Sequence, residues 1–157
     1  ANRLADKVNK LLDLTRLGYI DTGHLRIEKM PMDELILEMV TGYEYRTDIR
    51  FELNLMSVAF DGDAESWRIA VENILDNALR YAKTRIVLTL AKNSLSIYND
   101  GRQIDEAYLG SIFRPYEKSL DGQFGLGLAI VHKTVELYGY KIRVENVPDG
   151  VRFTIYR

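Results

Sequence analysis

Residues 63–81 read DAESWRIAVENILDNALRY and are the most regularly patterned segment of this 157-residue chain. Apolar residues recur there at helical spacing: Trp67, Ala70, Val71, Ile74, Leu75, Ala78 and Leu79. The spacing predicts one long helix from about Ala64 to Tyr81 with a single buried face. Asn73, Asn77 and Arg80 with Tyr81 follow one another at i, i+4 and i+7/i+8, which predicts a polar stripe along one flank of that helix.

Two asparagines one turn apart in mid-helix are unexpected, because asparagine is a mediocre helix former, and they suggest a functional role. The amide oxygens of Asn73 and Asn77 could ligate a hard cation such as Mg²⁺. The alternative is an ordinary solvated helix face. Glu72 and Asp76 are also spaced i, i+4, but nothing in the sequence indicates a cleft between them, so we interpret them as surface charges.

Strand and helix signals alternate on both sides of this helix. Strands are expected at Ile49–Leu53, Ser57–Phe60, Arg85–Leu90 and Leu95–Tyr98, further helices at Glu106–Phe113 and Leu126–Tyr138, and a closing hairpin at Lys141–Val147 and Val151–Tyr156. Neighbouring strands joined by short turns favour an α/β (α+β) fold. The predicted architecture is a two-layer α/β sandwich with a mixed sheet covered on one face by helices.

The N-terminal part has its own pattern. Apolar residues at helical spacing from Arg3 to Leu17, without an initial cap, indicate a helix entered midway. Gly18 to Gly23 then predict a linker, and Pro31 with Asp33 opens a second helix.

Composition limits the possible functions. With 46% apolar and 28% charged residues and a formal charge of −2, we expect one main globular domain and no nucleic-acid partner. The absence of cysteine excludes disulfides and thiolate chemistry. No apolar run approaches the roughly 20 residues of a membrane span, and the N-terminus does not resemble a signal peptide, so we expect no direct membrane contact in this fragment.

Two further segments could bind a ligand. Asn99-Asp100-Gly101-Arg102-Gln103-Ile104 follows a predicted strand directly, where a side-chain acceptor can be presented to a base edge; alone it is only a turn. Gly122-Gln123-Phe124-Gly125-Leu126-Gly127-Leu128 leads into a helix whose N–H groups favour an anion, and its alternative is a tight helix entry. His24 and His132 have no metal-like partner at helical spacing, and we interpret both as structural or surface residues.

In this order, the segments resemble the ATP-binding (GHKL, Bergerat) domain shared by histidine kinases, gyrase, Hsp90 and MutL, and specifically its histidine-kinase branch. Residues 63–81 resemble the N box, 99–104 the G1 box, Phe113-Arg114-Pro115-Tyr116 the F box, and residues 125–131 the G2 box. The resemblance covers about residues 20 to 157. Asp13-Leu14-Thr15-Arg16-Leu17 resembles the end of the second helix of a dimerisation and phosphoacceptor domain, which gives residues 1–20 to that helix and linker and 21–157 to the catalytic domain.

The resemblance implies ATP and Mg²⁺ as ligands. It implies that Asn77 binds Mg²⁺, that Asn73 assists near the phosphates, that Arg80 contacts phosphate oxygens and that Tyr81 stacks near adenine. It also implies that Lys118, in a short lid from about Glu117 to Phe124, reaches the terminal phosphates. The other expected nucleotide-binding positions are Asn99, Gly101, Ile104, Gly125, Leu126, Gly127 and Leu128.

Two departures from the family pattern affect affinity and lid geometry more than the fold. The G1 aspartate that accepts from the adenine amino group is here Asn99, followed by Asp100; an amide keeps an acceptor oxygen but reads adenine more weakly. Gln103 replaces the second G1 glycine, and the first G2 glycine is shifted to Gly122, with Gln123 in its place.

The related ATPases place a water-activating glutamate one turn before the metal-binding asparagine, and here that position is Asn73. This difference favours a kinase over a hydrolase. The resemblance then implies transfer of the γ-phosphate to a histidine outside this fragment, within a homodimeric sensor kinase whose parent protein lies in the cell membrane, and onward to a response regulator. The alternatives are a degenerate nucleotide-binding or scaffolding module, and a serine kinase or ATPase of the same superfamily.

Overall fold

The computed structural model describes residues 27–115 and 126–157. A five-stranded sheet has the strand order β2 (Arg50–Leu55), β4 (Arg85–Ala91), β5 (Ser94–Asn99), β7 (Gly150–Tyr156) and β6 (Lys141–Val147). β2 runs parallel to β4, and the other neighbours are antiparallel. The sheet is therefore mixed, as the sequence predicts.

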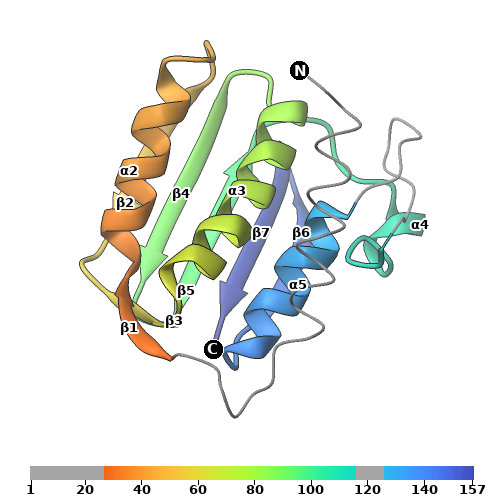
Figure 1. Cartoon of the computed structure of the whole chain (residues 1–157). Helices are drawn as coiled ribbons and strands as arrows, with labels where there is room; N and C mark the ends of the chain where they lie inside the picture. Colours follow the sequence, from red (N-terminus) through yellow and green to blue (C-terminus); the bar gives the residue numbers. More distant parts are fainter. Residues whose placement is uncertain (1–26, 116–125) are drawn as a thin grey trace.

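Helices α2 (Met32–Glu44), α3 (Ala64–Tyr81) and α5 (Gly127–Leu137) lie on one face of this sheet (Figure 1). α3 has the predicted bounds, and α5 is one residue shorter at each end than predicted. The short helix α4 spans only Glu106–Leu109. The chain then passes through turns and a bend over residues 110–115, so the predicted helix up to Phe113 is too long.

The remaining strands form a feature that the sequence pattern does not predict. β1 (Glu28–Pro31) pairs antiparallel with β3 (Ala59–Gly62) in a separate two-stranded sheet. The strand predicted at Ser57–Phe60 is therefore present, but it begins two residues later and does not join the main sheet. β1 was missed because only one of its four residues, Met30, is buried, which leaves no alternation to detect.

The core lies between the sheet and the helices. Strand residues alternate, so that Ile86, Leu88 and Leu90 of β4 are buried while the intervening residues are on the open face. The same alternation in β5 buries Leu95 and Ile97 and continues to the final residue of the strand, which is the polar Asn99. The side chain of Asn99 therefore belongs to the face of the sheet that the helices cover.

None of the helices within residues 27–115 and 126–157 has the length and apolar character needed to cross a bilayer. The predicted helix at Arg3–Leu17, the linker at Gly18–Gly23 and the boundary near residue 20 lie outside the described residues.

Candidate functional site

Asn73 and Asn77 lie one turn apart on α3. Asn73 is only 7% exposed, so the alternative of a solvated face is wrong at this position. Its Nδ2 donates to the carbonyl of Ile69 at 2.8 Å, which orients the amide and leaves Oδ1 as the end available to a ligand. Asn77 is half-buried, and its side chain has no hydrogen-bonding partner in the described part of the chain.

Arg80 and Tyr81 complete the stripe at the end of α3. Arg80 is exposed, and Tyr81 is half-buried. The hydroxyl of Tyr81 is buried, yet it has no hydrogen-bonding partner among the described residues. Buried hydroxyls are normally paired, so this atom fits a site that a ligand or water completes.

The carboxylates of α3 are on its surface, as the sequence predicts. Glu72 and Asp76 are both exposed. Asp76 accepts a hydrogen bond from the hydroxyl of Tyr43 at 3.1 Å, which connects α2 to α3. Burial, together with the nearby Asp76 charge, raises the pKa of the Tyr43 hydroxyl above its ordinary value.

The turn after β5 is built on Asn99. This side chain is only 1% exposed, and its Oδ1 accepts the backbone N–H of Gly101 at 2.9 Å. A Cβ on Gly101 would collide with the backbone carbonyl oxygen of Tyr81. The turn thus contacts the last residue of α3, and only glycine permits that approach.

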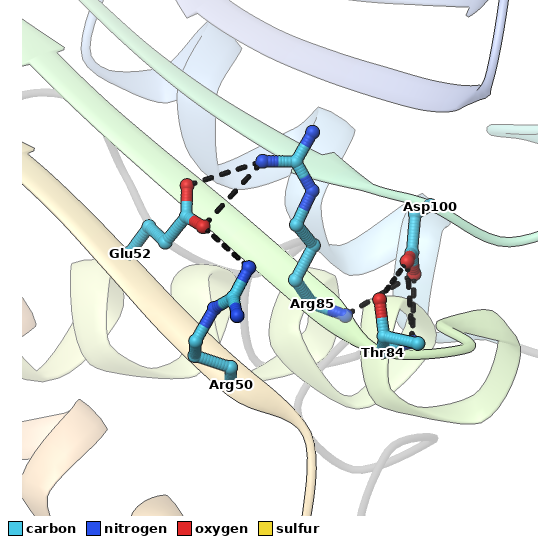
Figure 2. Close-up of polar contacts among 5 residues, drawn as sticks. All are labelled: Arg50, Glu52, Thr84, Arg85 and Asp100. Atoms are coloured by element: carbon cyan, nitrogen blue, oxygen red, sulfur yellow. Dashed lines mark hydrogen bonds and ion pairs between the residues drawn. The ribbon is translucent and has the colours of Figure 1, made fainter.

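Asp100 has a role that the sequence did not reveal. Its carboxylate accepts from the backbone N–H groups of Thr84 and Arg85 at 3.0 and 3.2 Å and from the Thr84 hydroxyl (Figure 2). It also accepts from the backbone N–H of Lys83 at 2.9 Å. Burial by itself raises the pKa of this carboxyl, but these hydrogen bonds outweigh it and hold the pKa well below its ordinary value. Asp100 therefore connects the loop after α3 to the turn after β5.

Arg85 connects this loop to the open face of the sheet. Its guanidinium pairs with Glu52 at 3.2 Å, and Glu52 also pairs with Arg50 at 2.9 Å (Figure 2). A groove of about 520 Å³ lies on that face around Arg85, Tyr98 and Asp149. The sheet separates this groove from the buried side chain of Asn99, so we do not assign it to the candidate site.

The end of the turn is joined to the closing hairpin. Asn146 accepts the N–H of Ile104 and donates to its carbonyl, both at 2.8 Å, and Gln103 Nε2 donates to the carbonyl of Val147 at 2.6 Å. A Cβ on Gly150 would collide with the carbonyl oxygen of Asn99. Gln103 thus contributes a hydrogen bond to the hairpin.

Phe113 and His132 connect the segment after α4 to α5. Their rings stack with centroids 5.8 Å apart, and Phe113 also meets the ring of Phe153 edge-on. His132 lies 2.9 Å from the carboxylate of Glu136 one turn later. This partly exposed histidine is a surface residue, in agreement with the sequence interpretation.

The helix α5 begins at Gly127, with Leu126 at its N-cap position. Leu126 offers no side-chain oxygen to the first N–H groups of the helix, and such a helix end favours an anionic ligand. Leu126 is buried, and Gly127 and Leu128 are half-buried. The predicted site residues Lys118 and Gly125 lie outside the described residues, as do Gly122, Gln123, Tyr116 and His24.

The described site residues come from three elements at one end of the molecule. Figure 1 shows the end of α3, the end of β5 and the first turn of α5 near the same end, and α5 packs against α3. In residues 27–115 and 126–157, no group of three His, Cys, Asp or Glu side chains could hold a metal ion.

The family described as "Histidine kinase-, DNA gyrase B-, and HSP90-like ATPase" matches residues 62–157, which include α3, the turn after β5 and α5. The chain belongs to this family. The fold and family predicted from the sequence are thereby confirmed.

Within this family, the similar proteins and solved structures described below are histidine kinases. Sensor histidine kinase CssS of Bacillus subtilis is 31% identical over 99% of this chain. The mycobacterial sensor histidine kinase MprB is 29% identical, with a TM-score of 0.74 over 83% of this chain and 95% of that structure. The catalytic domain of histidine kinase ThkA is 26% identical, with a TM-score of 0.71 over 83% of this chain and 95% of that structure. The chain spans about a third of the curated relatives, 36% of CssS and 35% of the sensor protein QseC of Escherichia coli.

Proposed function

We propose that this chain binds Mg·ATP and presents the γ-phosphate to a histidine of a phosphoacceptor domain. The proposal is carried by the oriented amide of Asn73, one turn before Asn77 on α3, together with the buried Asn99 turn and the uncapped start of α5. Positioning and electrostatic stabilisation are what phosphoryl transfer requires of a protein.

The residues of the candidate site fit a Mg²⁺–nucleotide ligand. Asn77 would bind Mg²⁺ through its amide oxygen, and Asn73 would assist near the phosphates. Arg80 and Lys118 would contact phosphate oxygens, and the first turn of α5 would direct its N–H groups at the same anion. The bound cation would neutralise charge on the transferring group.

A kinase fits α3 better than a hydrolase does. Hydrolysis needs a general base near the terminal phosphate, and the residue one turn before Asn77 is an asparagine. An amide cannot accept a proton from water at neutral pH. The nucleophile would then be a histidine supplied by another domain.

The similarity to sensor kinases also supports a proposal about the larger protein. Residues 1–20 would form the end of a dimerisation helix and a linker, and residues 21–157 the catalytic domain. The partners would be the phosphoacceptor domain, in a homodimer, and a response regulator. We place the catalytic domain in the cytoplasm of a kinase anchored in the cell membrane.

The test is calorimetric titration of this chain with ADP and a non-hydrolysable ATP analogue, with and without Mg²⁺. We expect saturable binding that depends on Mg²⁺ and is lost in Asn77→Ala, while circular dichroism shows an intact fold. Asn54→Ala, at an exposed position of β2, is the matched control and should bind like the wild type. Undiminished Mg²⁺-dependent binding by Asn77→Ala would refute the metal assignment.

The second candidate function is a nucleotide-binding or scaffolding module that does not transfer phosphate. The differences from the family pattern at Asn99 and Gln103 favour it. Incubating the full-length protein with γ-labelled ATP distinguishes this candidate from the kinase. Acid-labile labelling of an acceptor histidine supports transfer, and an unlabelled but nucleotide-binding protein supports the scaffold.

A further inference from the structure

One end of the buried side-chain amide of Asn99, its oxygen, already accepts a hydrogen bond within the protein. The backbone N–H of Gly101 can only donate, so the atom that it meets at 2.9 Å must be the acceptor Oδ1. The orientation of the amide therefore follows from the turn itself. Its Nδ2 has no hydrogen-bonding partner among the described residues, although the side chain is almost fully buried.

This arrangement changes what the side chain offers to a bound base. A carboxylate at this position would offer acceptors only, which suits an exocyclic amino group and repels a carbonyl oxygen. Asn99 instead offers the donor Nδ2 together with the remaining lone pair of Oδ1. A donor beside an acceptor can complement either a 6-aminopurine or a 6-oxopurine edge.

Rotating the amide does not restore an acceptor-only surface. Such a rotation would turn Nδ2 toward the N–H of Gly101 and leave that buried donor without a partner. Gly101 cannot move away easily, because it packs closely against the carbonyl of Tyr81. The turn thus keeps the donor of Asn99 in place.

We propose that Asn99 makes this site tolerant of 6-oxopurine nucleotides, so that hypoxanthine nucleotides bind comparably to adenine nucleotides. The inference rests on the proposed nucleotide-binding function and specifies the base that the site accepts. The feature that determines this base tolerance is the hydrogen-bond donor Nδ2 of the buried Asn99 side chain.

The experiment compares the affinities of ADP and IDP for the 157-residue chain by calorimetry in the presence of Mg²⁺. IDP is the chosen probe because it differs from ADP only at the 6-position and the adjacent ring nitrogen. We expect the two dissociation constants to differ by less than about tenfold, and Asn99→Asp to shift their ratio toward ADP by about tenfold or more. The ratio is measured because the added negative charge repels the phosphates of both nucleotides alike.

Asn93→Asp, in the exposed turn between β4 and β5, is the matched charge control and should leave the ratio unchanged. A wild-type preference for ADP of about tenfold or more overturns the inference and leaves the nucleotide-binding function standing. A ratio that Asn99→Asp does not move also overturns it. Failure of a folded chain to bind either nucleotide overturns both proposals.

Discussion

Asp100 and Gly101 show how much of the site depends on two adjacent residues. Asp100 accepts three backbone N–H groups from the loop after α3, and Gly101 permits close contact with the carbonyl of Tyr81. Neither residue needs to touch a ligand to matter, because both hold the turn that carries Asn99. Their effects can be separated by stability and binding measurements.

Asp100→Asn should lower the free energy of unfolding by about 1–2 kcal/mol at pH 7, because a neutral amide accepts these hydrogen bonds less well. The folded pKa of Asp100 lies below its unfolded value, so its stabilisation is present above about pH 5 and is lost as the pH falls. Urea unfolding at about pH 7, 5 and 3.5 should therefore show the gap between wild type and variant narrowing toward acid. A gap that is constant over this range would contradict the assignment.

Gly101→Ala should abolish nucleotide binding or weaken it by about tenfold or more, since the added methyl group forces the turn away from Tyr81. Gly110→Ala is the matched control, because a Cβ there meets nothing within 4 Å. Calorimetric titration with ADP and Mg²⁺ measures both variants. Equal affinities for the two would show that the close approach has no functional role.

At the scale of elements, α3 links the core to the site. Asp63 caps its N-terminus by accepting the N–H of Ser66 at 3.0 Å, and the buried face of the helix packs on the sheet. The opposite end carries Asn77 and Tyr81. A helix held at both ends can keep side chains of its last turns in a fixed position.

Asp63→Ala should reduce the free energy of unfolding by about 1 kcal/mol through loss of this cap. Asp105→Ala removes the equivalent cap from the four-residue helix α4, which buries no side chain, and should cost less. Denaturant titration of both variants measures the difference. A larger loss for Asp105→Ala would contradict the view that α3 carries the stability of this region.

At the scale of the whole molecule, aromatic rings join the small sheet to the main one. Trp67 of α3 is fully buried and packs against the rings of Phe60, Tyr138 and Tyr140, with its Nε1 donating to the carbonyl of Asp61 at 3.0 Å. The carboxylate of Asp61 also pairs with Lys29 and with Arg157, each at 2.5 Å. The β1–β3 sheet is thereby attached to the residue that follows β7.

Trp67→Phe should lower the free energy of unfolding by about 1–3 kcal/mol, because it leaves a void and removes the hydrogen bond to Asp61. Trp67 is the only tryptophan of the chain, so its fluorescence in the wild type reports on this junction. We expect fluorescence and far-ultraviolet circular dichroism to give the same urea midpoint. Separate midpoints would show that the junction unfolds independently of the sheet.

The sequence by itself determined the main helices and strands and the family, although it did not show β1 and gave α4 too great a length. Helical periodicity predicted α3 with its observed bounds, and strand alternation with turn residues predicted the strands of the mixed sheet, because these signals are local. Pro148, Asp149 and Gly150 likewise predicted the turn of the closing hairpin. The order of the motifs carried the family resemblance.

The tertiary structure alone decided which polar atoms of the candidate site form hydrogen bonds within the protein and which remain available to a ligand. Asn146 meets Ile104 across 42 positions, and Asp100 meets a loop 15 to 17 positions earlier, so no local pattern could reveal either pairing. The sequence placed an acceptor at Asn99, but the fold assigns that acceptor to Gly101. A side chain forms a hydrogen bond only with groups that the fold brings within about 3 Å. Packing decides which groups those are, and the residue type does not.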